Sequence, residues 1–205
     1  MLLLGMLGCA SPQLDTPDSP AQTATTPPAA AATPAADPAQ AVRTFLGWYA
    51  ARMDSPALYE EFVKHENGVD TLNYYVDSQA TETWLTKLQA TGMFSDAFLQ
   101  GWRQHFREAA QELKRHPLND GPPPGFDYDF FMLSQEPNLI ATDLQAGSFQ
   151  TVNTGAGRAR VLARGRKHEE GHYAGLDFVL SRTPDQRWQI DSISNAGQVF
   201  EPAEP

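Results

Sequence analysis

The pattern His-Glu-x-x-His is present at residues 168–172 of this chain. On a helix, this spacing places two imidazoles on one face, where they can bind Zn²⁺ with the glutamate beside them as a general base. Here the pattern lies between two segments with strand periodicity, and Gly171 falls inside it. We therefore expect a hairpin connection with no catalytic metal and no other cofactor, in which His168 and His172 bind a metal weakly at most.

Two carboxylates flank Tyr128 at the position where we expect the sheet to begin. Asp127 and Asp129, at strand spacing, would point to the same side. Two carboxylates in a cavity can divide into an acid and a base when their surroundings separate their pKa values. The competing interpretation, which we favour, is structural, because such side chains also cap turns or form salt bridges with arginines.

Four arginines share one face of a segment whose residues alternate with a period of two. Small apolar residues, Ala159, Val161 and Ala163, occupy the opposite face. Because four guanidinium groups on one face repel each other, we expect acidic partners from later strands, such as Asp177 and Asp191. The face is either a solvated outer surface of the sheet or a site for a partner with carboxylates or phosphates, which Arg binds in a bidentate manner. The four residues are Arg158, Arg160, Arg164 and Arg166.

The only cysteine, Cys9, follows the apolar residues 1–8 and directly follows Leu7 and Gly8. This arrangement resembles the signal of bacterial lipoproteins. The resemblance implies that residues 1–8 are removed and that Cys9 carries a lipid. Acyl chains would then hold the protein to a bilayer by about 0.8 kcal/mol per buried methylene. The expected location is the cell envelope, on the periplasmic side of the outer membrane.

The composition divides the rest of the chain into a tether, a domain and a tail. Residues 10–37 are mostly Pro, Ala, Thr, Ser and Asp, and such a segment buries too little apolar surface to fold. We expect a disordered tether that reaches at most roughly 85 Å, a single domain at 38–196 and a flexible tail at 197–205. One cysteine excludes disulfides within the chain. The net charge of −10 argues against binding to nucleic acid or directly to anionic lipid headgroups.

Hydrophobic periodicity predicts helices first and strands afterwards. Apolar residues at three- and four-residue spacing predict helices over about 38–55, 71–90 and 95–116. After the Pro- and Gly-rich loop 119–125, the period becomes two. The predicted strands cover 144–152, 158–167, 174–180 and 188–193. This order predicts an α+β domain with an antiparallel meander.

Three segments carry a resemblance to a known fold. They are Val42-x-x-Phe45-Leu46-x-x-Tyr49 in the first predicted helix, Asp-Tyr-Asp-Phe-Phe at 127–131 and Trp-Gln-Ile-Asp-Ser-Ile at 188–193. Over about 40–195, the chain resembles bacterial envelope lipoproteins with a domain of unknown function 3828, in the nuclear transport factor 2-like (cystatin-like) superfamily. The resemblance implies N-terminal helices packed in a curved antiparallel sheet. It transfers no catalytic residues, and the insertion at 116–125 departs from its pattern.

Together these features predict a non-enzymatic, lipid-anchored binding or accessory module with another envelope protein as its partner. Two other functions stay open. One is a hydrolase or isomerase of small molecules that uses Asp127 or Asp129 in a cone-shaped cavity, and the other is an immunity-type protein against a secreted toxin. Aromatic residues in the helical half either fill the concave side of the sheet or line a pocket. They are Trp48, Tyr74, Tyr75, Trp84, Trp102 and Phe106.

Overall fold

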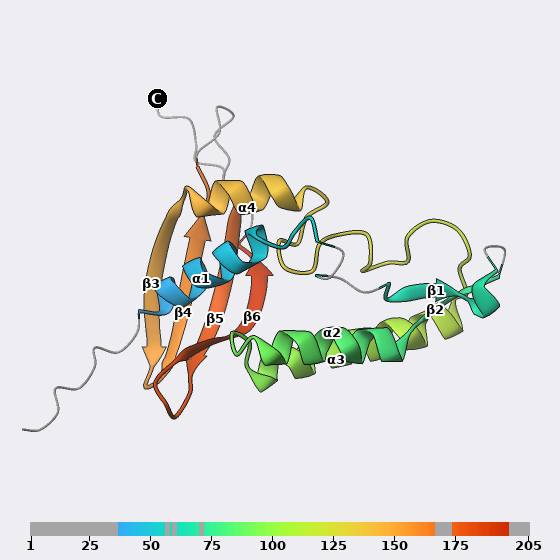
Figure 1. Ribbon diagram of the computed structural model, residues 1–205, viewed down its shortest axis with the longest axis horizontal. Coiled ribbons are helices and arrows are strands. Elements are labelled where there is room, and N and C mark those ends of the chain that lie inside the picture. The colour runs from blue at the N-terminus through green and yellow to red at the C-terminus, as the bar shows by residue number, and fades with distance from the viewer. Residues whose placement is uncertain (1–36, 56–57, 59–60, 70–71, 167–173, 197–205) are drawn as a thin grey trace, which may run out of the picture. The chain divides into compact units, whose positions relative to one another are not determined.

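The structure, a computed structural model, describes residues 37–55, 58, 61–69, 72–166 and 174–196. These residues belong to one compact unit of the chain, Pro34–Pro205, in which helices pack against an antiparallel sheet (Figure 1). Within this part, no helix combines the length and the apolar character needed to cross a bilayer. The elements are α1 (Pro38–Ala50), β1 (Val63–His65), the 3-10 helix η1 (Glu66–Gly68), β2 (Tyr74–Val76), α2 (Ser78–Ala90), α3 (Asp96–Arg115), α4 (Pro137–Gln145), β3 (Ser148–Gly155), β4 (Arg158–Arg164), β5 (Gly175–Arg182) and β6 (Trp188–Asn195).

The strands β3, β4, β5 and β6 form an antiparallel meander, and α1 contacts β3, β4 and β6 (Figure 1). The first helix begins where the sequence predicts it, since the Asp37 carboxylate accepts the Ala39 N–H at 3.0 Å and Pro38 starts the helix. Its apolar face is buried, and the Phe45 ring lies 5.8 Å from that of Phe178 in β5. The predicted α+β class and the meander are confirmed.

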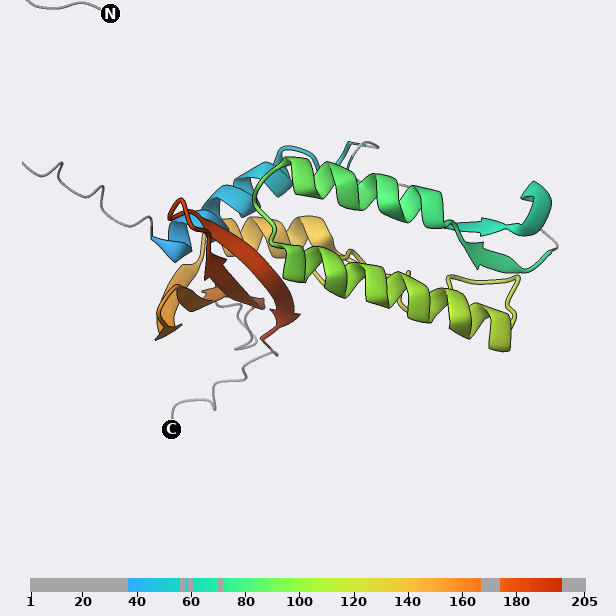
Figure 2. The same ribbon diagram turned by 90° about the horizontal axis from the view of Figure 1, so that it is seen from below.

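Helices α2 and α3 form an antiparallel hairpin whose connecting turn is bonded to β6 (Figure 2). Ile190 donates its N–H to the Met93 carbonyl at 2.9 Å and accepts the Ser95 N–H at 3.0 Å. Beside them, Gln189 Nε2 donates to the Gly92 carbonyl at 3.0 Å. The open edge of the sheet is therefore partly covered, and the hairpin is held at its base.

The turn at 127–133 inserts aromatic residues between the helices and the sheet. The Asp129 carboxylate accepts the backbone N–H groups of Phe131 and Met132 at 2.8 and 2.6 Å and the Tyr49 hydroxyl at 2.9 Å. Phe131 is fully buried, and its ring contacts aromatic rings from α1, α2 and α3. The prediction that 127–131 opens the sheet is wrong. In a strand, the N–H groups of Phe131 and Met132 would pair with a neighbouring strand, but here they are bonded to the Asp129 carboxylate.

The predicted second helix at 71–90 is correct only from Ser78 onward. Residues Tyr74–Val76 form β2, which pairs with β1 in a two-stranded sheet. The helix starts later because the Asp77 carboxylate accepts the N–H groups of Gln79 and Ala80 at 2.8 and 3.1 Å. This cap ends the extended segment, and the small sheet was not predicted.

The predicted strand at 144–152 is wrong in its first part. Helix α4 occupies Pro137–Gln145 and buries Ala141 and Leu144 against the core, and β3 begins only at Ser148. Between them, Gly147 lies so close to β4 that a Cβ atom there would be 1.9 Å from the Arg164 carbonyl oxygen. Only glycine allows the backbone of residue 147 to lie this close to β4, and this position separates α4 from β3.

We expect Asp129→Ala to lower the free energy of unfolding by about 2–4 kcal/mol, because it leaves two turn N–H groups and the Tyr49 hydroxyl without their acceptor. Asp127→Ala is the matched control, since Asp127 is exposed two residues away, and its effect should stay within about 0.5 kcal/mol. Urea denaturation followed by circular dichroism measures both. Equal losses in the two variants would contradict the structural role of Asp129.

Candidate functional site

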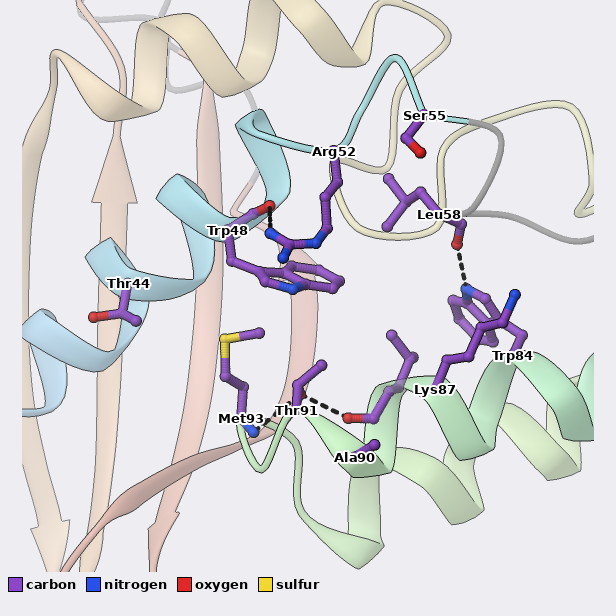
Figure 3. A pocket seen from close by; sticks show the side chains of 11 residues that line it. Thr44, Trp48, Arg52, Ser55, Leu58, Trp84, Lys87, Ala90, Thr91 and Met93 are labelled. Atoms are coloured by element: carbon purple, nitrogen blue, oxygen red, sulfur yellow. Dashed lines mark hydrogen bonds between the residues drawn. The ribbon is translucent and has the colours of Figure 1, made fainter.

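A cavity of about 600 Å³ lies between α1 and α2, beside the segment that follows α1 (Figure 3). Its described lining combines aromatic and aliphatic side chains with two cations. The lining residues are Thr44, Trp48, Arg52, Ser55, Leu58, Trp84, Lys87, Leu88, Ala90, Thr91 and Met93. Its volume and mainly apolar walls are those of a site for a small molecule.

Two tryptophans set the apolar walls. Trp84 of α2 is fully buried, and its indole Nε1 donates to the Leu58 carbonyl at 3.0 Å, which ties the segment after α1 to α2. Trp48 of α1 lies 6.1 Å from Phe94 and 6.0 Å from Phe131, measured between ring centroids. Both walls are therefore held by the core and not by exposed loops.

The two cations lie on opposite sides of the cavity (Figure 3). The Arg52 guanidinium lies over the Trp48 ring at 5.4 Å, and its Nη1 donates to the Trp48 carbonyl at 3.2 Å. Lys87 extends from α2 beside Trp84. The described lining holds these two cations and no Asp or Glu. Such a cavity can hold a ligand with an apolar body and an anionic group.

The predicted arginine face exists, but half of it is paired. Arg160 forms a bidentate salt bridge with Asp177 of the neighbouring strand, as predicted, with Nε at 2.8 and 2.7 Å from the two carboxylate oxygens. This bond raises the pKa of the Arg160 guanidinium further above its ordinary value. Arg166 lies 3.4 Å from Asp143 of α4, a partner that the sequence did not indicate. Arg158 is exposed, and the Nε of Arg164 is buried without a hydrogen bond among the described residues.

Three carboxylates, those of Asp127, Asp129 and Asp191, differ in their contacts from what the sequence predicts. Asp191 does not pair with an arginine within the described part of the chain, since its Oδ1 accepts the Ser181 hydroxyl at 2.7 Å instead. The structure separates Asp127 from Asp129: Asp127 is exposed in the loop and Asp129 binds the turn. The expectation that the two carboxylates share a strand face is therefore wrong.

Two predicted sites lie outside the described residues, namely Cys9 and the histidine pair His168 and His172. Among the residues that the structure does describe, no group of three His, Cys, Asp or Glu side chains is close enough together to hold a metal ion. The lipid anchor and the weak metal binding therefore stay predictions.

Arg52 and Lys87 were not identified from the sequence. The available signal was their helical spacing from an aromatic residue, with Arg52 four residues after Trp48 and Lys87 three residues after Trp84. Trp84 and Lys87 therefore share a face of α2, whereas Arg52 lies in the turn that follows α1. Of the aromatic residues that the sequence assigns to core or pocket, Trp84 and Phe106 are buried, and Trp48, Trp84 and Trp102 line cavities. Tyr75 of β2 is exposed and does neither.

Comparisons of this chain with protein-family models, with curated proteins and with solved structures find no match. The aromatic walls and the two cations are the chemical features of the cavity that a ligand would meet.

We expect Trp84→Phe to lower the free energy of unfolding by about 1–3 kcal/mol more than Trp48→Phe does, because only Trp84 donates an indole hydrogen bond to a buried carbonyl. Both variants remove the same volume, but Trp84 is fully buried and Trp48 is half-buried, so the difference contains the greater packing loss at Trp84 together with the bond to Leu58. Guanidinium denaturation measures the two losses. If Trp48→Phe costs as much as Trp84→Phe, the bond does not hold the cavity wall.

Proposed function

We propose that this chain is a non-enzymatic binding module whose cavity between α1 and α2 takes a molecule with an apolar body and one anionic group. The composition of the wall carries this proposal. Indole and aliphatic side chains supply the apolar surface, and Arg52 and Lys87 supply positive charge on opposite sides. A ligand carboxylate at the edge of the cavity gains charge-assisted hydrogen bonds from these cations. The apolar body of the ligand is removed from water when it enters the cavity.

The way in which the Arg52 side chain is held favours a role in binding an anionic ligand over that of an ordinary solvated surface charge. Its guanidinium is kept over the Trp48 ring and bonded to the backbone of α1, the helix that it follows. A side chain held in this way loses less conformational freedom when it binds an anion. The ligand class is therefore amphipathic anions such as medium-chain carboxylates.

Isothermal titration calorimetry of the full chain with sodium octanoate tests the proposal. We expect the double variant Arg52→Gln/Lys87→Gln to weaken octanoate binding by roughly fivefold, because the single carboxylate loses a partly exposed ion pair that contributes up to about 1 kcal/mol. The control Lys114→Gln/Arg115→Gln removes the same charge from the exposed end of α3 and should change the dissociation constant less than twofold. Neutral 1-octanol should bind less tightly than octanoate.

Two results would overturn the proposal. One is equal weakening by both double variants, which means that net charge alone attracts the probe. The other is an absence of octanoate binding to the unaltered chain.

We further propose that the module belongs to the nuclear transport factor 2-like superfamily and is held at the bacterial envelope by a lipid on Cys9. The N-terminal helix packed on an antiparallel meander supports the fold assignment, and the Leu-Gly-Cys sequence at residues 7–9 supports the anchor. Mass spectrometry of the N-terminal peptide, purified from a bacterial membrane fraction, should show Cys9 as the first residue with acyl chains attached. An unmodified Cys9 within a longer peptide would contradict the anchor.

A further inference from the structure

A second cavity, of about 280 Å³, is formed by the first turns of α1, the turn that joins α2 to α3, and the start of β6. Its walls are mainly apolar. The lining residues are Asp37, Gln40, Ala41, Thr44, Thr91, Gly92, Met93, Arg187, Trp188 and Ile190. Three of them, Thr44, Thr91 and Met93, also line the cavity between α1 and α2, so the two cavities are adjacent.

One face of α1 runs along both cavities. Gln40, Thr44 and Trp48 follow each other at four-residue spacing, which places them on the same side of the helix. At 1.5 Å per residue, Gln40 and Trp48 are about 12 Å apart along the helix axis. Arg52 lies beyond Trp48, in the turn that follows α1. The two cavities therefore lie one after the other along α1, and Arg52 is at the end of the first one.

The hydroxyl groups at the junction of the two cavities are hydrogen-bonded within the protein. The Thr44 hydroxyl donates to a carbonyl of its own helix at 2.9 Å. The Thr91 hydroxyl donates to a carbonyl of α2 at 2.6 Å and accepts the Met93 N–H at 3.2 Å. Because these groups already have partners, an apolar chain can lie against them without leaving one unpaired. The Met93 side chain extends from the turn toward Trp48 (Figure 3), and such an unbranched thioether adapts its shape to a neighbouring group.

The charges in the two cavities differ. The first cavity has Arg52 and Lys87 and, within its described lining, no carboxylate. The second has one cation and one anion, Arg187 and Asp37, and Arg187 Nε already donates to Asp185 at 2.6 Å. An anionic group is therefore bound better in the first cavity, and an apolar chain attached to it would extend toward the second.

The second cavity offers apolar surface for the end of such a chain. Ala41 of α1, Met93 of the turn and Trp188 of β6 are half-buried and pack against the core. The apolar surface that these side chains still expose leaves water when a methylene chain covers it. Since the three residues come from different elements that pack on one core, the walls are held by the fold itself.

We propose that the two cavities together bind one long-chain carboxylate. The carboxylate lies near Arg52 and Lys87, and the end of the chain lies among Ala41, Met93 and Trp188. This ligand class rests on the proposed function and narrows it to carboxylates with a longer chain than that of octanoate.

Isothermal titration calorimetry of the full chain compares sodium dodecanoate, below the concentration at which it forms micelles, with sodium octanoate. We expect dodecanoate to bind at least tenfold more tightly, because its additional methylene groups leave water in the second cavity. Ala41→Phe fills that cavity and should reduce this preference to less than threefold, while the dissociation constant of octanoate changes less than twofold. The control Ala110→Phe adds the same ring at a half-buried position of α3 that lines neither cavity, and it should keep the preference.

If Ala41→Phe does not fold, Gln40→Trp provides the test, because Gln40 is exposed and lines the second cavity. We expect it to lower the preference for dodecanoate at least threefold, whereas Gln111→Trp on the exposed side of α3 should not. Dodecanoate binding no more tightly than octanoate would overturn this inference but not the proposed function, as would the same preference in Ala41→Phe and Ala110→Phe. An absence of octanoate binding to the unaltered chain would overturn both.

Discussion

The structure depends on one carboxylate that holds a turn inside the protein. Asp129 binds two backbone N–H groups of its own turn and the Tyr49 hydroxyl of α1. These bonds place Phe131 where rings from three helices meet it. Because neighbouring aromatic rings pack closely, the position of Phe131 sets the separation of α1 from the helical hairpin. The cavity between α1 and α2 lies in that separation.

The elements that the sequence predicts well are those whose signal is local. Helices α1 and α3 have a capping residue followed by a regular apolar face, and β4 alternates arginine with small apolar residues that are all fully buried. The errors occur where a single contact decides whether a segment is a helix or a strand. Residues before Asp77 have the apolar spacing of a helix but are extended, because the helix begins only where the Asp77 carboxylate caps it. Gly147 separates α4 from β3, because the Arg164 carbonyl lies against it.

The two cavities could not be predicted from sequence, for a related reason. Each combines side chains from segments that lie far apart in the chain, such as Arg52 with Lys87 and Ala41 with Trp188. Periodicity shows which face of a helix is apolar but not which other helix it meets. The arginine face was visible in the sequence, and its pairing with Asp177 was predictable because both residues lie on adjacent strands. The pairing of Arg166 with Asp143 required α4, which was missed.

The long separations between bonded residues have a consequence for how the chain folds. The bonds Tyr49–Asp129, Gln145–Leu46 and Gln189–Gly92 join residues 80, 99 and 97 positions apart. Contacts of this range slow folding, because a large loop must close before they form. During synthesis, the apolar face of α1 leaves the ribosome long before the strands that will cover it. That face therefore stays uncovered until the meander is complete.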